Sequence, residues 1–190
     1  MPQLVLASSS PRRRDLLTRL GVLPARIASP DINENPHKGE LPRVYALRMA
    51  VDKAHALRRG EGEIVLAGDT TVAVGRRILP PAVDADMQRS LLELLSGRRH
   101  HVLSAVCVID LDGTERSRIS DSIVRFKRLG AAEIDAYIKC GEGLGKAGGY
   151  AIQGKAEALI DWMAGSHSGV IGLPLYETRA LLIASGYPLD

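Results

Sequence analysis

The sequence predicts an α/β protein with a mixed, twisted central sheet flanked by helices. Short apolar runs, which are typical of strands, alternate with segments whose apolar residues recur at the spacing of one helix face. In the middle of the chain two strand-like runs flank Asp112-Gly113, a dipeptide that favours a tight hairpin between antiparallel strands. Alternating strands and helices with a central hairpin favour a mixed sheet over an entirely parallel one.

The length and composition predict one domain, residues 1–190, with a proper hydrophobic core. The chain has 190 residues, of which 45% are hydrophobic, enough for one compact α/β unit with a cleft. It has neither an apolar stretch of about 18 uncharged residues nor the pattern of a signal peptide. Cys107 and Cys140 are too few for a disulfide framework and lack metal-ligand spacing. We therefore expect a cytoplasmic protein without a membrane span.

The charge and the aromatic content argue against a nucleic-acid partner. The net charge of +3 is mild, and the basic residues are scattered except for the run Arg12–Arg14. One Trp, one Phe and five Tyr supply few side chains on which bases could stack. A small anionic ligand fits this balance better than a polymer.

The stretch Leu4–Leu17 predicts a strand, a tight turn and the start of a helix. Ser10 before Pro11 suits an N-cap followed by proline at the first helical position, where the missing N–H costs nothing. Such a helix start directs free N–H groups outward, and hydroxyls and permanent cations lie beside it: Ser8, Ser9, Arg12, Arg13 and Arg14. These features predict a phosphate site. The alternative is that Ser10 only caps a surface helix whose arginines face solvent.

The next segments are predicted from turn residues and apolar spacing. Ile27–Pro36 combines Pro, Asp, Asn and Glu and is expected to be a loop. Leu41–Arg59 carries an apolar stripe at helical spacing, with a proline in its first turn, and is expected to be a helix. Ile64–Ala67 and Val72–Val74 are short apolar runs separated by Gly-Asp-Thr-Thr, which we interpret as one strand that ends there and a second strand-like piece.

The second half of the chain continues the alternation. Periodicity predicts helices at Asp84–Leu95, Ala131–Lys139 and Leu175–Ser185, and strands at His101–Leu111 and Arg116–Phe126. Gly141–Gly149 is expected to be a glycine-rich loop, Tyr150–Gln153 a short extended piece, and Leu159–Met163 either strand or helix.

Three residues are candidates for phosphate chemistry. Asp69 follows an apolar strand, and the ends of strands are where open α/β sheets bind ligands; its carboxylate could hold a metal or deprotonate water. The alternative is a turn aspartate bonded to its own backbone. Glu34 could be a second carboxylate for a shared Mg²⁺, or an exposed loop acid. Lys53, at the edge of the apolar stripe, either snorkels or reaches into a cleft.

The segment Gly141–Gly154 has six glycines together with Lys146 and Gln153. It is not a Walker A loop, because Ala147 follows the Gly-Lys pair, and it lacks the dinucleotide-binding fingerprint. Its backbone could still approach a phosphate, although turn-forming glycines are an equally good interpretation. A nucleophile and base pair for covalent catalysis is not recognisable elsewhere.

Taken in order, six segments resemble the signature segments of the Maf family of nucleoside triphosphate pyrophosphatases. They are LVLASSSPRRRDLL, Arg48-Met49-Ala50 with Lys53-Ala54, AGDTTVAVGRRIL, LLELLSGRRHHV, GKAGGYAIQG and GSHSGVIGLPLYET, which run from Leu4 to about Leu182. The resemblance implies the fold of the inosine-triphosphate pyrophosphatases, with two lobes and a deep cleft, which often occurs as a homodimer. It also implies a hydrolase that converts a nucleoside triphosphate to the monophosphate and pyrophosphate with a divalent cation, Mg²⁺ or Mn²⁺.

Carried over position by position, the resemblance assigns a role to each candidate residue. Ser8, Ser10, Arg12 and Arg13 would bind the triphosphate, Lys53 the phosphate charge, Gln153 the nucleotide, Asp69 and Glu34 the metal, and Asp69 would also activate water. The segments Ile152–Gly154 and Gly165–Ser168 resemble the branch of the family that acts on dTTP and UTP. The alternative branch acts on 7-methyl-GTP.

The chain departs from the family pattern at three positions near the residues that would bind phosphate and metal. The family usually has a lysine where this chain has Pro81, and Arg76 or Arg77 are candidates to replace that charge. Asn33 stands where a second acid often precedes the glutamate, and Gly145 where many relatives have aspartate. An alternative function is therefore a nucleotide-binding regulatory protein, related to cell division, with weak or no turnover.

Overall fold

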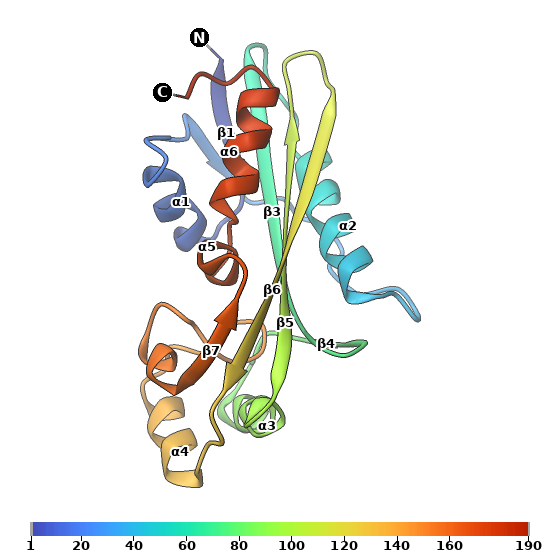
Figure 1. The fold of residues 1–190 in the computed structure, drawn as a ribbon. Coiled ribbons are helices and arrows are strands. Elements are labelled where there is room, and N and C mark those ends of the chain that lie inside the picture. The colour runs from blue at the N-terminus through green and yellow to red at the C-terminus, as the bar shows by residue number, and fades with distance from the viewer. Residues whose placement is uncertain (1, 190) are drawn as a thin grey trace.

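The computed structural model describes residues 2–189, which form a mixed sheet of seven strands with helices on both faces (Figure 1). The strands are β1 (Gln3–Ala7), β2 (Arg26–Ala28), β3 (Glu63–Val74), β4 (Arg77–Leu79), β5 (Arg99–Ile109), β6 (Glu115–Phe126) and β7 (Ile160–Ala164). The helices are α1 (Pro11–Thr18), α2 (Pro42–His55), α3 (Ala85–Leu95), α4 (Ala131–Lys139), the 3₁₀ helix η1 (Lys155–Leu159), α5 (His167–Ile171) and α6 (Leu175–Ala184).

The sheet combines parallel and antiparallel pairs, as the sequence predicts. Its order is β2-β1-β3-β5-β6-β7, and β4 pairs with the last residues of β3. β1 is parallel to β2 and β3, whereas β3, β5, β6 and β7 are successively antiparallel. Figure 1 shows α1 and α6 beside one end of the long strands and α3 and α4 beside the other. The central mixed sheet flanked by helices confirms the predicted fold class.

Each face of the sheet packs against its own apolar core, because successive strand side chains point to opposite faces. In β1, Leu4 and Leu6 belong to the larger core, whereas Val5 and Ala7 belong to the smaller core under α2. The helix α2 contributes small residues at four-residue spacing to the smaller core: Ala46, Ala50 and Ala54. Side chains this short let α2 lie close to β3, and this closeness places the neighbouring Lys53 against the sheet.

The strand β3 differs from its prediction. It is one strand of 12 residues, Glu63–Val74, without a turn at Gly-Asp-Thr-Thr. Its pairing with β5 is continuous there, with Asp69 opposite Ala105 and Thr70 opposite Ser104. Pairing with a long neighbouring strand outweighs the local turn preference of Gly and Asp. Asp69 therefore lies within a strand and not at its end, but β1 stops opposite Ala67, so β3 passes beyond its parallel neighbour at this point.

Other boundaries also shift. The predicted helix Leu41–Arg59 ends at His55, and the predicted loop Ile27–Pro36 begins with the last residues of β2. The expected extended piece Tyr150–Gln153 instead runs into a turn, and the ambiguous Leu159–Met163 becomes the end of η1 followed by β7. Asp84 caps α3 by accepting a hydrogen bond from Met87 N–H, which confirms the predicted start of that helix.

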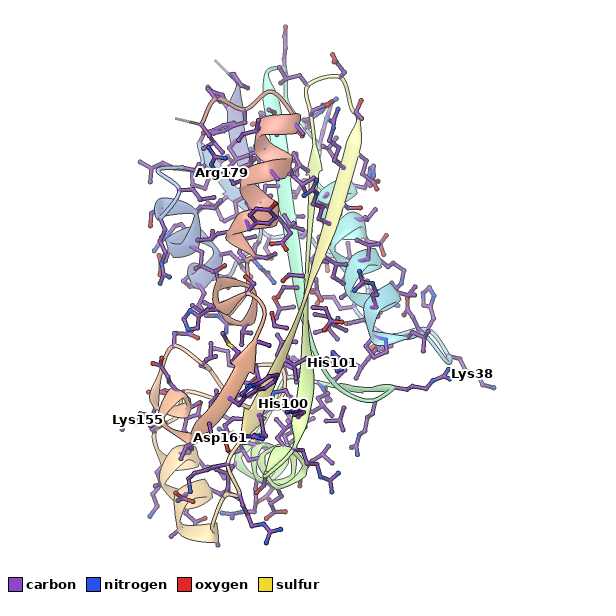
Figure 2. All side chains as sticks on the ribbon, viewed as in Figure 1. Lys38, His100, His101, Lys155, Asp161 and Arg179 are labelled. Atoms are coloured by element: carbon purple, nitrogen blue, oxygen red, sulfur yellow. The ribbon has the colours of Figure 1, made fainter. Side chains whose placement is uncertain are left out.

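Charged side chains cover the outer surface; Lys38 and Lys155, for example, point away from the sheet (Figure 2). None of the helices within residues 2–189 is long and apolar enough to cross a membrane.

Candidate active site

Arg13, near the start of α1, has its guanidinium group held by contacts within the protein. Arg13 is bound by the protein: its Nε donates to the Gly172 carbonyl oxygen at 2.8 Å, and its terminal nitrogens donate to Ser8 Oγ at 3.0 Å and Thr70 Oγ1 at 3.4 Å. Burial lowers the pKa of Arg13, while Asp69 and Glu34 act in the opposite direction. Arg13 thus ties α1 to the middle of β3 and to the end of α5.

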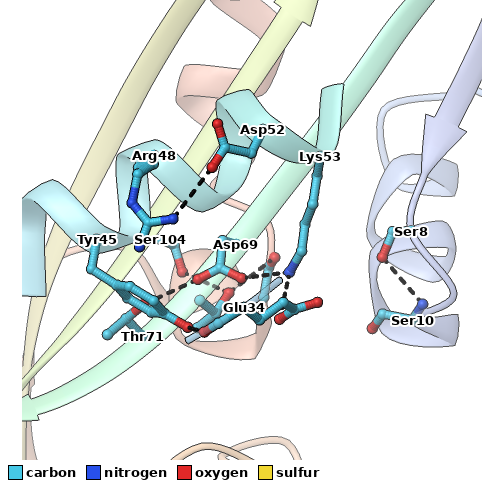
Figure 3. A network of polar contacts seen from close by, with 12 residues as sticks. Ser8, Ser10, Glu34, Tyr45, Arg48, Asp52, Lys53, Asp69, Thr71 and Ser104 are labelled. Atoms are coloured by element: carbon cyan, nitrogen blue, oxygen red, sulfur yellow. Dashed lines mark hydrogen bonds and ion pairs between the residues drawn. The ribbon is translucent and has the colours of Figure 1, made fainter. Parts of the chain in front are cut away.

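Ser10 occupies the predicted N-cap position, but its hydroxyl makes no capping hydrogen bond. Its backbone N–H instead donates to Ser8 Oγ at 3.2 Å (Figure 3). Ser8 is buried by these contacts, whereas Ser10 and Arg12 line an open cavity. The predicted positions of Ser10 at the N-cap and Pro11 at the first helical residue are thus confirmed, while the hydroxyl of Ser10 makes no capping bond.

Asp69, Lys53 and Glu34 form the charged centre of the site (Figure 3). Lys53 Nζ lies 2.8 Å from Asp69 Oδ1 and 3.0 Å from Glu34 Oε2, so one ammonium group bridges two carboxylates. Asp69 and Lys53 are only 7% and 8% exposed, while Glu34 lies in an exposed loop. Buried charges need such partners, because an unpaired one would lose its hydration without compensation.

The second oxygen of Asp69 is also held. Thr71 Oγ1 donates to Asp69 Oδ2 at 3.0 Å. Both carboxylate oxygens therefore have a donor, and the carboxylate has a fixed orientation. On the opposite side of the strand, Thr70 Oγ1 lies 3.1 Å from Ser104 Oγ. Thr70, Thr71 and Ser104 carry no role in the sequence analysis; the only signal for them was their place beside Asp69 or in a neighbouring strand.

The loop that carries Glu34 is anchored by α2. Tyr45 OH donates to the Glu34 carbonyl oxygen at 2.7 Å, and Arg48 donates to the Asn35 carbonyl oxygen at 3.3 Å. Arg48 also pairs with Glu40 at 2.7 Å, which lowers the pKa of Glu40 to about 2. Burial, and then the nearby Asp69 and Glu34, raise the pKa of Tyr45 to about 12. The sequence predicted neither anchor, although Arg48 belongs to one of the signature segments.

Two adjoining cavities lie on one side of this centre, and the inner one reaches Asp69. The outer cavity has a volume of about 630 Å³ and is lined by Ser9, Ser10, Pro11, Arg12, Glu142, Gly145, Lys146, Ala151, Gln153 and Gly154. The inner cavity, of about 130 Å³, reaches Asp69, Arg13, Thr70 and Pro81 and shares Arg12, Gly145 and Lys146 with the outer one. Gln153 is thus brought near Ser10 and Arg12 but lines only the outer cavity, away from Asp69.

The donor set suits a divalent cation that prefers oxygen ligands. Within residues 2–189 no group of three or more His, Cys, Asp and Glu side chains gathers at one point. Mg²⁺, however, is commonly held by one or two carboxylates together with water and substrate phosphates. Asp69 and Glu34 are two such carboxylates, and in this structure Lys53 Nζ lies between them.

Arg12, Arg13 and Lys146 line the inner cavity together with the Asp69 carboxylate, and this concentration of cations is typical of proteins that bind phosphorylated anions. A family described as Maf-like protein matches residues 3–185. The chain belongs to this family.

Curated relatives span the whole chain. A protein of Sphingopyxis alaskensis named dTTP/UTP pyrophosphatase is 64% identical, with 100% of both chains covered. A protein of Novosphingobium aromaticivorans with the same name is 60% identical over 97% of this chain and 92% of that one. A protein of Anaplasma phagocytophilum named nucleoside triphosphate pyrophosphatase is 51% identical over 98% and 96%.

Among solved structures, a HAM1 protein from Coxiella burnetii aligns with a TM-score of 0.50 at 16% identity, covering 97% of this chain and 100% of that chain. This likeness concerns the fold and confirms the predicted mixed α/β architecture.

Proposed function

We propose that this protein hydrolyses nucleoside triphosphates, preferably dTTP and UTP, to the monophosphate and pyrophosphate. The observation that carries the proposal is the oriented, buried Asp69 carboxylate beside a cavity lined by Arg12. The names of the full-length relatives support the choice of dTTP and UTP.

In the proposed mechanism Asp69 is the general base. Its carboxylate takes a proton from a water molecule that attacks the α-phosphorus, and the bond from that phosphorus to the bridging oxygen of pyrophosphate breaks. Lys53 and Thr71 hold the carboxylate in place. Arg12 binds the departing pyrophosphate and offsets its growing charge, while Arg13 holds the Ser8 turn in position.

Asp69 and Glu34 would hold the divalent cation, Mg²⁺ or Mn²⁺. When bound, such an ion supplies positive charge that neutralises the phosphate oxygens. Lys53 supplies charge to the same two carboxylates and keeps their oxygens turned toward one point. Gln153, at the outer cavity, is proposed to contact the nucleoside.

A panel of nucleoside triphosphates, incubated with Mg²⁺ while pyrophosphate release is measured, tests the activity. We expect the fastest release from dTTP and UTP, and a loss of at least about 10²-fold in Asp69→Asn, because removal of a general base costs that much. Asp112→Asn, in the exposed β5–β6 turn, is the matched control.

Full turnover in Asp69→Asn would disprove the role of Asp69. Triphosphate binding by the wild type without any pyrophosphate release would instead favour the regulatory alternative. Faster release of pyrophosphate from 7-methyl-GTP than from UTP would instead assign the chain to the branch of the family that acts on 7-methyl-GTP.

A further inference from the structure

Lys146 lies where the two cavities join. The residues shared by the outer and inner cavities are Arg12, Gly145 and Lys146, so two cationic side chains border the passage between them. Arg12 comes from α1, and Lys146 comes from the glycine-rich segment after α4. A ligand that occupies both cavities, from Gln153 to Asp69, therefore lies beside these two side chains.

Neither cation at this passage is neutralised by the protein. Among the described residues Lys146 Nζ has one hydrogen-bond partner, the Leu144 carbonyl oxygen at 3.5 Å, and no carboxylate within 4.0 Å. Burial, and then the charge of Arg12, lower the pKa of Lys146. Like charges that face each other in a partly buried passage repel, and an anion between them removes that cost.

The backbone holds Lys146 in place. Its carbonyl oxygen accepts from Ala82 N–H at 3.2 Å and from Gly149 N–H at 2.9 Å, while its own N–H donates to the Gly143 carbonyl oxygen at 3.2 Å. A side chain at Gly143 is impossible without a shift, because its Cβ would lie 2.1 Å from the Gly149 carbonyl oxygen. These contacts fix the main chain and leave the ammonium group available for a ligand.

The other candidate cations do not reach the passage. Arg76 and Arg77 are exposed at the turn between β3 and β4 and line neither the outer nor the inner cavity. Pro81, in contrast, lines the inner cavity and bridges to Ala147 in the antiparallel sense. The charge that reaches the wall beside Pro81 is therefore that of Lys146.

We propose that Lys146 is a phosphate-binding residue that, together with Arg12, clamps the phosphate chain of the substrate between the outer and inner cavities. This inference rests on the proposed function, because it assumes that the ligand carries a di- or triphosphate. The Lys146 ammonium group donates to phosphate oxygens on the side of the passage opposite α1.

The test measures binding of inorganic pyrophosphate by calorimetry, alongside kcat and KM for UTP. In Lys146→Met, which keeps an unbranched side chain but removes the ammonium group, we expect pyrophosphate to bind about 10- to 100-fold more weakly, as for the loss of a hydrogen bond to a charged group. KM should rise by a similar factor. Lys139→Met, on the exposed end of α4, is the matched control and should bind like the wild type.

The double variant Lys146→Met with Pro81→Lys restores a cation to the same wall, because Pro81 bridges to Ala147, the neighbour of Lys146. Recovery of pyrophosphate affinity supports the proposal that the positive charge of Lys146 binds the phosphate groups. Unchanged affinity in Lys146→Met overturns the proposal, as does a loss without recovery that accompanies a lowered melting temperature, because loop packing then explains it. Should the methionine variant not fold, Lys146→Gln is measured in the same way.

The two proposals can fail separately. If the wild type hydrolyses UTP and Lys146→Met matches it in KM and in pyrophosphate affinity, the inference fails and the function stands. If the wild type hydrolyses no triphosphate although pyrophosphate binding depends on Lys146, the function fails and the clamp remains as an anion site.

Discussion

Lys53 joins parts of the site that are distant in the sequence. Its ammonium group lies within 3.0 Å of Glu34, from the loop before α2, and within 2.8 Å of Asp69, from β3. The residue types and motif positions of all three are readable from the sequence. The bridge between them is not, because it depends on how closely the alanine face of α2 packs on the sheet. Their roles in catalysis and metal binding stay predictions.

His100 is a buried histidine that supports the inner cavity from behind. It is 1% exposed, its ring stacks on Phe126 with centroids 5.9 Å apart, and its Nε2 lies 2.7 Å from Tyr150 OH. Tyr150 in turn lines the inner cavity. Burial lowers the pKa of His100 to about 4, so the folded protein holds this histidine neutral near pH 7.

This histidine predicts an acid-sensitive stability. Between its unfolded pKa of about 6.5 and its folded pKa the unfolded chain binds a proton that the folded chain does not, so stability falls as pH is lowered through this range. The shift corresponds to about 3 kcal/mol. Urea unfolding at several pH values should show the decline, and His100→Gln, which can still bond Tyr150 OH, should flatten it.

His167→Gln, on the exposed first residue of α5, serves as the control and should keep the wild-type slope. A His100→Gln profile as steep as that of the wild type between pH 6.5 and pH 4 would show that other groups cause the acid sensitivity.

At the scale of elements, α2 organises the loop that carries Glu34. Arg48 binds Glu40 and the Asn35 carbonyl oxygen, and Tyr45 binds the backbone of Glu34 itself. An exposed loop without regular structure would otherwise sample many conformations. The helix therefore limits where the Glu34 carboxylate can lie.

Replacing Arg48 tests this anchoring. In Arg48→Met we expect faster proteolytic cleavage within residues 33–40 and a several-fold higher KM for Mg²⁺, with kcat at saturating Mg²⁺ changed less, because the loop is freed while Asp69 keeps its donors. Arg43→Met, whose exposed guanidinium lies 3.9 Å from Asp121, is the control. Equal cleavage of the two variants would contradict the anchoring role.

The elements also show where sequence patterns suffice. The strongly periodic segments Asp84–Leu95 and Ala131–Lys139 are helices within one residue of their predicted bounds. At β3 the local turn residues were misleading, because eleven-residue β5 pairs across them and extends the strand. The five-residue helix α5 has too few positions to show a period, and it was not predicted.

At the scale of the molecule, the long strands connect both ends of the fold. β3, β5 and β6 have 12, 11 and 12 residues and run the length of the sheet (Figure 1). Because each end is built on the same strands, neither end has a complete core of its own. We therefore propose that residues 1–190 unfold as one domain. The homodimer implied by the resemblance stays a prediction, which sedimentation velocity can test.

Two probes of urea unfolding test the single domain. The only tryptophan, Trp162, lies in β7, where Arg99 stacks over its ring at 4.5 Å, so its fluorescence reports on that end. Far-ultraviolet circular dichroism reports on the whole chain. We expect coincident midpoints, as for cooperative unfolding. A tryptophan transition at lower urea than the dichroism transition would show two separately folding parts.

Because β1 ends early, part of one edge of β3 has no neighbouring strand within residues 2–189. β1 pairs with β3 as far as Ala67, and β4 joins the same edge from Val72. Between them, at Gly68–Thr71, every second residue turns its N–H and C=O toward that edge, where no described strand meets them. Main-chain groups cannot be removed by changing a side chain. Variants of Arg12 or Lys146 should therefore leave these backbone groups in place, because such variants change side chains alone.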